Sequence, residues 1–158
     1  MKLNDSIFLT TVMVAVISGP VIAETSNFDT LTLSRGFAPS AAVVQGMTGG
    51  SYSLSSIATR DGQNFCLGFG SPAPDHILHL EQDFPALTLL VETRGRNTTL
   101  LVQGPDQKTV RCGHGGGPRP TDTKIKDVNW KAGTYRIWVG SSEAGNRHPY
   151  KLSVSETE

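Results

Sequence analysis

Asp75 and His76 are adjacent in a chain that contains many serines, and these residue types together could support catalysis. In a serine hydrolase an Asp orients a His, and the His takes the proton of a Ser. Neighbouring residues on a β-strand point to opposite faces, so Asp75 can orient His76 only if the chain bends there. No serine lies in the Gly-x-Ser-x-Gly motif of many hydrolases. We therefore expect no catalytic residues, and a cryptic serine hydrolase remains only an alternative.

The four histidines could also bind a metal ion. His76 and His79 are three residues apart, a spacing that places them on opposite faces of a strand, so they cannot both bind one ion. His114 and His148 fall in segments expected to be loops. The sequence therefore predicts no metal site and no cofactor.

Arg136 and Trp138 are the residues most suited to ligand binding. Apolar side chains alternate along this segment, which predicts a strand with one face on the core and with both of these residues on the other face. The predicted core face carries Tyr135, Ile137 and Val139. An exposed Trp beside an Arg can stack on a sugar ring or anchor a protein contact. Alternatively, Trp138 is buried under the second sheet or under a loop at 113–120, since large aromatic side chains usually are buried.

Cys66 and Cys112 are the two cysteines of the chain. In an oxidising compartment they predict one disulfide. The alternative is a pair of free thiols for redox or metal chemistry, but the two residues lack the Cys-x-x-Cys spacing that such sites use.

The first residues resemble a secretory leader. The apolar run at 7–17 is shorter than the about 20 residues that a membrane-spanning helix needs, and it is followed by Gly19-Pro20 and then by Val21-Ile22-Ala23. Small residues in these positions favour cleavage by a signal peptidase after Ala23. We expect a signal peptide at 1–23 and a mature chain, 24–158, that is secreted or periplasmic and does not span the membrane.

Charge excludes two classes of partner. The 158-residue chain has 14 Lys and Arg against 14 Asp and Glu, so its formal net charge is zero. Nucleic acids and anionic lipids favour basic surfaces. We therefore expect neither as the main partner.

The mature chain contains a succession of short strand candidates separated by Gly, Pro, Asn and Asp. This spacing predicts an all-β fold, an antiparallel β-sandwich in one domain over 24–158. The pattern that places Ile137 inside also places Tyr150, Leu152 and Val154 in the core, and Trp130 should fill one end of it. The candidates cover 31–37, 52–58, 65–69, 76–81, 87–93, 99–103, 109–112, 124–128, 134–139 and 150–155.

Several of these segments together resemble the bacterial pre-peptidase C-terminal domain over about 84–156. They are Phe84-Pro85-Ala86-Leu87, the run from Asn97 to Asp106, Cys112, the run from Ala132 to Gly140, and Tyr150-Lys151-Leu152. The resemblance implies a jelly-roll-like β-sandwich that serves as an accessory or substrate-binding module of exported enzymes. Related domains hold calcium in acidic loops, whereas here the segment 113–117 has no carboxylate and the next one is Asp122. We therefore do not expect calcium.

These observations predict a non-catalytic binding or accessory module whose ligand is a glycan or another component of the cell envelope. The alternative is an interaction partner or chaperone of an exported peptidase. An exposed Trp138 would favour the glycan, and a large exposed apolar patch would favour the protein partner.

Overall fold

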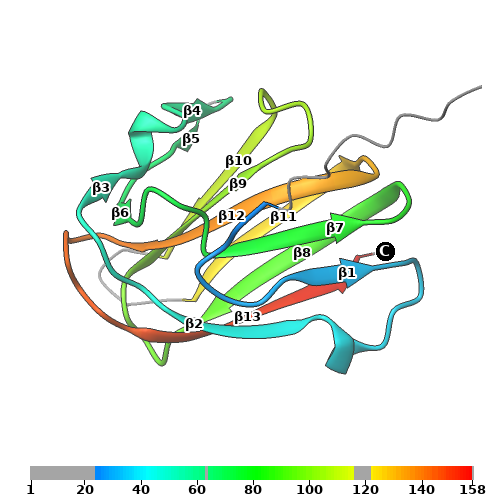
Figure 1. The fold of residues 1–158 in the computed structure, drawn as a ribbon, viewed down its shortest axis with the longest axis horizontal. Helices are drawn as coiled ribbons and strands as arrows, with labels where there is room; N and C mark the ends of the chain where they lie inside the picture. Colours follow the sequence, from blue (N-terminus) through cyan, green and yellow to red (C-terminus); the bar gives the residue numbers. More distant parts are fainter. Residues whose placement is uncertain (1–23, 63, 116–121, 158) are drawn as a thin grey trace, which may run out of the picture.

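Two β-sheets pack face to face in the computed structural model, which describes residues 24–62, 64–115 and 122–157 (Figure 1). All strand pairs are antiparallel except one, and the only helices in the described part are two short 3-10 turns. The predicted all-β, antiparallel sandwich is therefore confirmed. No helix of the described residues is long and apolar enough to cross a membrane. The predicted signal peptide at 1–23 lies outside the described residues.

The first sheet is arranged around its longest strand, β12. It contains β1 (Leu31–Leu33), β3 (Tyr52–Ser53), β6 (Phe69–Gly70), β7 (His76–Leu80), β9 (Thr98–Gln103), β10 (Val110–His114) and β12 (Gly133–Ser141). One edge of β12 pairs with β7 and then, at Ser141, with β6, while the other edge pairs with β9. Strand β10 continues the sheet beyond β9, and β1 runs parallel to β7 at the opposite edge.

The second sheet has four strands in the order β11, β8, β13 and β2. Their bounds are β2 (Val43–Met47), β8 (Phe84–Glu92), β11 (Thr123–Trp130) and β13 (Pro149–Glu156). The 3-10 turn η1 (Pro39–Ala41) precedes β2. A separate hairpin, β4 (Arg60–Asp61) and β5 (Asn64–Phe65), follows the second 3-10 turn, η2 (Leu54–Ser56).

Apolar side chains from the facing surfaces of both sheets form the main core. The strand facing expected from the alternating pattern is confirmed, because all six residues assigned to the core belong to this cluster: Tyr135, Ile137, Val139, Tyr150, Leu152 and Val154. Trp130 is fully buried at one end, where its ring lies 5.3 Å from that of Tyr135. The indole N–H of Trp130 donates to the carbonyl of Asp127, so the buried ring leaves no polar atom unpaired.

A second, smaller cluster lies on the outer face of the first sheet. It joins Leu101 of β9 and Trp138 of β12 to Leu54 and to the disulfide between Cys66 and Cys112. The predicted disulfide is thus confirmed, with a Cα–Cα distance of 5.2 Å. It holds the segment 52–66 against β10, together with a hydrogen bond of 3.2 Å from the Cys112 amide to the Asp61 carboxylate.

A tight turn at 104–107 lies between β9 and β10. The amide of Gln107 donates to the carbonyl of Gly104, which closes the four-residue turn around Pro105 and Asp106. The Asp106 carboxylate accepts from the amide and the hydroxyl of Thr109 at 2.8 and 2.7 Å. The side chain therefore fixes the turn that leads into β10.

Several strand bounds differ from the expectation. The strand expected at 31–37 ends at Leu33, the one at 52–58 is replaced after Ser53 by η2, and the one at 65–69 is split into β5 and β6. Strand β2 was not expected at all. It is an edge strand paired only with β13, and Val44 is its one buried residue, so it lacks the apolar alternation that identifies a half-buried strand.

Candidate functional site

Asp75 and His76 do not act on one another. The Asp75 carboxylate accepts from the backbone amide of Val139 at 2.8 Å and from the side-chain amide of Asn27 at 3.0 Å. The His76 ring lies on the core side, with Nδ1 at 2.8 Å from the carbonyl oxygen of Asp29 and Nε2 at 2.8 Å from the Tyr150 hydroxyl. The hydrogen-bond partners of these two residues therefore hold parts of the fold together and form no Asp–His relay.

Burial is the main cause of the pKa shifts of Asp75, His76 and Tyr150. Desolvation lowers the pKa of His76 and raises that of Tyr150, so both rings are neutral at pH 7. Desolvation also raises the pKa of Asp75 to about 6, although the hydrogen bonds from Asn27 and Val139 oppose the shift. Asp75 therefore carries its charge in the native state only above mildly acidic pH.

The raised pKa predicts that Asp75 makes the protein less stable as pH rises. Native Asp75 binds its proton at about pH 6, whereas an unfolded Asp does so at about 3.9. Its stabilising contribution, on the order of 2 kcal/mol, is therefore complete below about pH 4 and is lost as pH rises through about 6. His76, whose pKa is lowered, contributes in the opposite direction, since its stabilisation is lost as pH falls.

The Asp75→Asn variant isolates this contribution, because it removes the titration and leaves His76 in place. Urea unfolding of both proteins between about pH 4 and about pH 7 should show the wild type losing stability relative to the variant as pH rises. The Asn side chain has one acceptor oxygen fewer at every pH, which changes the free energy of unfolding by an amount that does not depend on pH. A difference between the two proteins that does not change with pH would contradict the prediction.

The other histidines are dispersed. His79 points away from the core and lies 2.9 Å from the hydroxyl of Thr134, as the expected opposite facing of His76 and His79 requires. His114 is exposed at the end of β10, and His148 precedes β13. Within 24–62, 64–115 and 122–157, no group of three or more His, Cys, Asp or Glu side chains is placed to hold a metal ion.

Arg136 and Trp138 lie on the outer face of β12, as the pattern predicts, but they do not form an open pair. Trp138 is only 4% exposed. It is buried by Leu54 of η2 and by the Cys66–Cys112 disulfide. The covers considered from the sequence were instead the second sheet or the loop at 113–120. The guanidinium of Arg136 is paired with Glu24 and lies 3.5 Å from the side-chain oxygen of Gln103. Trp138 could stack on a sugar only if segment 52–66 moved away.

A groove of about 420 Å³ opens beside this cover, where the last residues of β12 lie between β6 and β9. Leu67 and Phe69 form its apolar part, with Gly68 between them and Gly115 on the opposite wall. The remaining residues are polar and neutral or weakly basic: Ser53, Ser55, Asn97, Thr99, His114 and Ser142. No Asp, Glu, Lys or Arg of residues 24–62, 64–115 and 122–157 lines the groove.

Thr99 marks the floor of the groove. Its hydroxyl oxygen is the one buried side-chain polar atom of the described residues without a hydrogen-bond partner. Two glycines give it space: a Cβ on Gly68 would overlap it, and a Cβ on Gly140 would lie 2.7 Å from it. Gly68 also has φ of +104°, which other residues rarely adopt. Since a buried hydroxyl without a partner is costly, this position would gain from a group that enters the groove and accepts or donates a hydrogen bond.

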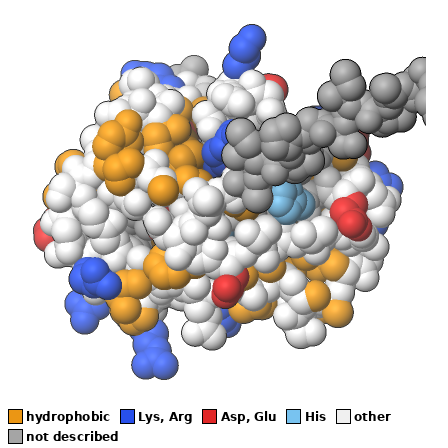
Figure 2. Space-filling view, in the orientation of Figure 1, with side chains coloured by type: hydrophobic (Ala, Val, Ile, Leu, Met, Phe, Trp, Pro, Cys, Tyr) orange, Lys and Arg blue, Asp and Glu red, His pale blue; other side chains and the backbone are white. Residues whose placement is uncertain are grey.

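An exposed apolar surface adjoins the groove. Tyr52, Phe65 and Leu67 are 38, 49 and 53% exposed. Figure 2 shows hydrophobic side chains gathered on this side of the molecule, over the region of β3 to β6. The guanidinium of Arg60 lies 3.8 Å above the Phe65 ring and covers part of it.

Sequence reasoning did not identify the groove. Its residues come from separate segments at 53–55, 67–69, 97–99, 114–115 and 142, and Ser, Asn and Gly are ordinary loop residues in such segments. The one available signal was the position of Cys66, since a disulfide from this residue to Cys112 had to bring the segment around Leu67 close to the end of β10.

Comparisons with known proteins leave the family open. No protein-family model matches this chain. An uncharacterized protein of Synechococcus elongatus is 38% identical over 63 residues, which make up 40% of this chain and 42% of that protein. The match thus spans about two fifths of that relative's length.

Two solved structures are similar in fold. The pre-peptidase C-terminal domain of a collagenase from Bacillus anthracis is 14% identical, with 86% of this chain and 100% of that chain covered and a TM-score of 0.49. A periplasmic inhibitor of g-type lysozyme from Aeromonas hydrophila is 20% identical, with 80% and 97% covered and a TM-score of 0.38. The similarity to both structures concerns the fold alone.

Proposed function

We propose that this chain is a non-catalytic binding module that acts outside the cytoplasm and takes a neutral glycan in the groove above Thr99. The observation that carries the proposal is the lining, in which the described residues provide two apolar side chains, six hydrogen-bonding side chains and no Asp, Glu, Lys or Arg. A sugar presents the same combination, because its ring has apolar faces and its rim carries hydroxyls.

The polar groups of the groove suit hydroxyls. The hydroxyls of Ser53 and Thr99 can each donate and accept a hydrogen bond, as can the Asn97 amide, and the ring nitrogens of His114 add further polar groups. The apolar faces of a sugar ring would pack against Phe69 and Leu67. A charged ligand would instead leave its charge without a partner in the groove, which is costly. The volume is within the range of about 300–1,000 Å³ that is usual for ligand sites.

Two further points support a binding role outside the cytoplasm. Hydrolysis of a glycosidic bond ordinarily requires two carboxyl groups on either side of the bond, and the described residues of the groove lining include no Asp or Glu. The disulfide fits an oxidising compartment, where envelope glycans are located. Export by the predicted signal peptide at 1–23 would bring the module there.

Titration with neutral and acidic oligosaccharides tests the proposal. We expect calorimetry to detect chitotriose or cellotriose, and the charged trigalacturonate to bind more weakly. Asn97→Ala and His114→Ala should each weaken binding by up to about tenfold, as is typical for the loss of one hydrogen bond. His148→Ala is the matched control, because His148 lies outside the groove. Equal losses in His114→Ala and His148→Ala, or no binding of any neutral sugar, would refute the glycan proposal.

The exposed apolar surface supports a second candidate, an interaction with an exported enzyme. Exposed aromatic and aliphatic side chains that lie together commonly mark protein contacts, and Tyr52, Phe65 and Leu67 all lie on or beside the segment held by the disulfide. The double variant Tyr52→Ser and Phe65→Ser separates the two candidates, because both side chains are exposed and neither lines the groove. Loss of an enzyme partner without loss of sugar binding would identify the surface, and not the groove, as the functional site.

A further inference from the structure

We propose that a small pocket beside Arg111 is a binding site for a carboxylate. This site is separate from the groove and does not depend on the proposed function. It lies at the end of the sandwich where the β9–β10 turn meets the β11–β12 turn. The two turns are in close contact, since a Cβ on Gly133 would lie 2.7 Å from Pro105. The pocket that they enclose measures about 150 Å³.

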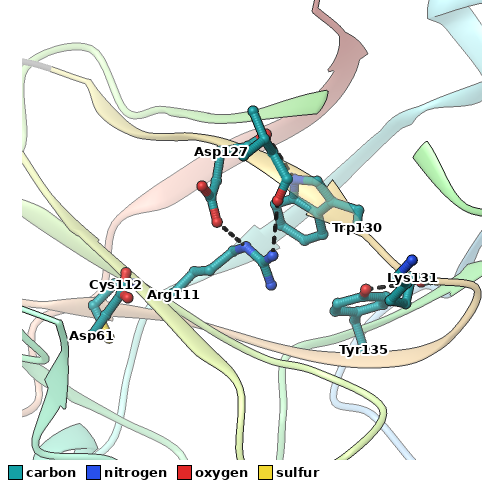
Figure 3. A network of polar contacts seen from close by, with 8 residues as sticks. Asp61, Arg111, Cys112, Asp127, Trp130, Lys131 and Tyr135 are labelled. Atoms are coloured by element: carbon teal, nitrogen blue, oxygen red, sulfur yellow. Dashed lines mark hydrogen bonds and ion pairs between the residues drawn. The ribbon is translucent and has the colours of Figure 1, made fainter. Parts of the chain in front are cut away.

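Arg111 is the central residue of the pocket. It is only 6% exposed. Its Nε donates to the Asp127 carboxylate at 2.5 Å, and one terminal nitrogen, Nη2, lies 3.3 Å from the carbonyl of Val128. The guanidinium also lies 4.0 Å above the Trp130 ring, so its plane is fixed on one side (Figure 3).

These contacts leave one edge of the guanidinium open. The other terminal nitrogen, Nη1, donates to none of the described residues, and Figure 3 shows it on the side away from Asp127. Asp127 and Trp130 hold the guanidinium in place, and Nη1 stays accessible from the pocket, since the Thr99 hydroxyl is the one buried side-chain polar atom of the described residues without a partner. The fork of an Arg side chain matches the two oxygens of a carboxylate.

The other groups of the pocket favour an anion. Lys131 lines the pocket, although its ammonium is also 2.8 Å from Asp83. Among the described residues of the lining Asp106 is the one carboxylate, and both of its oxygens already accept from Thr109 in the turn. Asn129 adds an amide that can donate. Arg111 Nη1 and the Asn129 amide therefore offer donors to the pocket, and Lys131 adds a positive charge that it shares with Asp83.

The ligand could come from two sources, a small free acid or the C-terminal carboxylate of a peptide. An NMR titration distinguishes them with three probes: sodium acetate, an acetylated tripeptide with a free C-terminus, and the same tripeptide as the C-terminal amide. We expect saturable shifts of the Asn129 side-chain amide and of Arg111 Nε–H with the free acids, and none with the amide. A response to acetate alone would support a small free acid as the ligand.

The Asn129→Asp variant tests the site without altering Arg111. Asn129 has a φ of +58°, which Asp also tolerates, and the new negative charge should weaken carboxylate binding about tenfold or more. Gln45→Glu makes the same change of charge at an exposed position of β2, so this variant should bind the carboxylate probes like the wild type. Unchanged binding in Asn129→Asp, equal binding of the amide, or no saturable response to either acid would overturn the proposal.

Discussion

Removal of the Cys66–Cys112 disulfide is expected to lower the free energy of unfolding by about 4 kcal/mol, the largest single effect that we expect in this chain. The bond joins residues that are 46 positions apart, so without it the unfolded chain regains much conformational freedom. The total stability of a domain is commonly about 5–15 kcal/mol. Urea unfolding of the double variant Cys66→Ala and Cys112→Ala should therefore show a midpoint far below that of the wild type.

The loss should also be uneven over the molecule. The disulfide ties segment 52–66 to β10 over Trp138, whereas the core between the sheets has no part in it. Hydrogen exchange of the variant should therefore increase first at the amides of Cys66 and Leu54, whose acceptors lie within and beside this segment, and last in β8 and β13. Reduction of the wild type should reproduce the pattern. A midpoint like that of the wild type, or equal acceleration in both sheets, would show that the segment is held mainly by its other contacts.

The same segment explains why strand facing could be predicted and exposure could not. Alternation of apolar residues is a local property, and it correctly placed Ile137 inside and Trp138 on the other face of β12. Whether that other face is open depends on what the rest of the chain lays over it. Leu54 comes from far upstream along the sequence, and no local pattern shows that it packs on Trp138.

The groove and the Arg111 pocket were beyond prediction for a related reason. Both are formed where turns from separate segments meet, and their residues carry no motif. Arg111 would be read from the sequence as an exposed residue of a strand, since a charged side chain is rarely buried unless it is paired. Its burial follows from Asp127 and Trp130, which come from another sheet and reach Arg111 only when the two sheets pack.

Strand β2 shows that apolar periodicity does not identify every strand of the fold. An edge strand with a single buried side chain is stabilised by its ladder with β13 and not by an apolar face. Whether β2 forms therefore depends on β13, its partner in the ladder, and the residues of β2 alone do not show it. The bounds of β9, β12 and β13, which all contribute several side chains to the core, were in contrast within two residues of the expectation, whereas β8 begins three residues earlier than expected.

Truncation of Ile137 to Ala is expected to cost about 2–5 kcal/mol, which makes it the second-largest effect. Ile137 is fully buried in the middle of β12, between β7 and β9, where its backbone neighbours are His76 and Val102. The lost methyl and methylene groups would leave a cavity between the two sheets, and these sheets are held in register by their ladders and cannot close it fully. Thermal or urea unfolding monitored by circular dichroism measures the loss.

Lys151→Ala is the control for that experiment, because it removes a long side chain from the outer face of β13. The ammonium of Lys151 is 2.6 Å from the Glu92 carboxylate, and the two side chains are 49 and 39% exposed. An exposed ion pair of this kind contributes little, so we expect a change within about half a kcal/mol. The two variants together test the facing of both sheets, since one residue lies on the core side of β12 and the other on the solvent side of β13. Similar losses in both would mean that Lys151 supports the structure through contacts other than its ion pair, or that the core packs differently around Ile137.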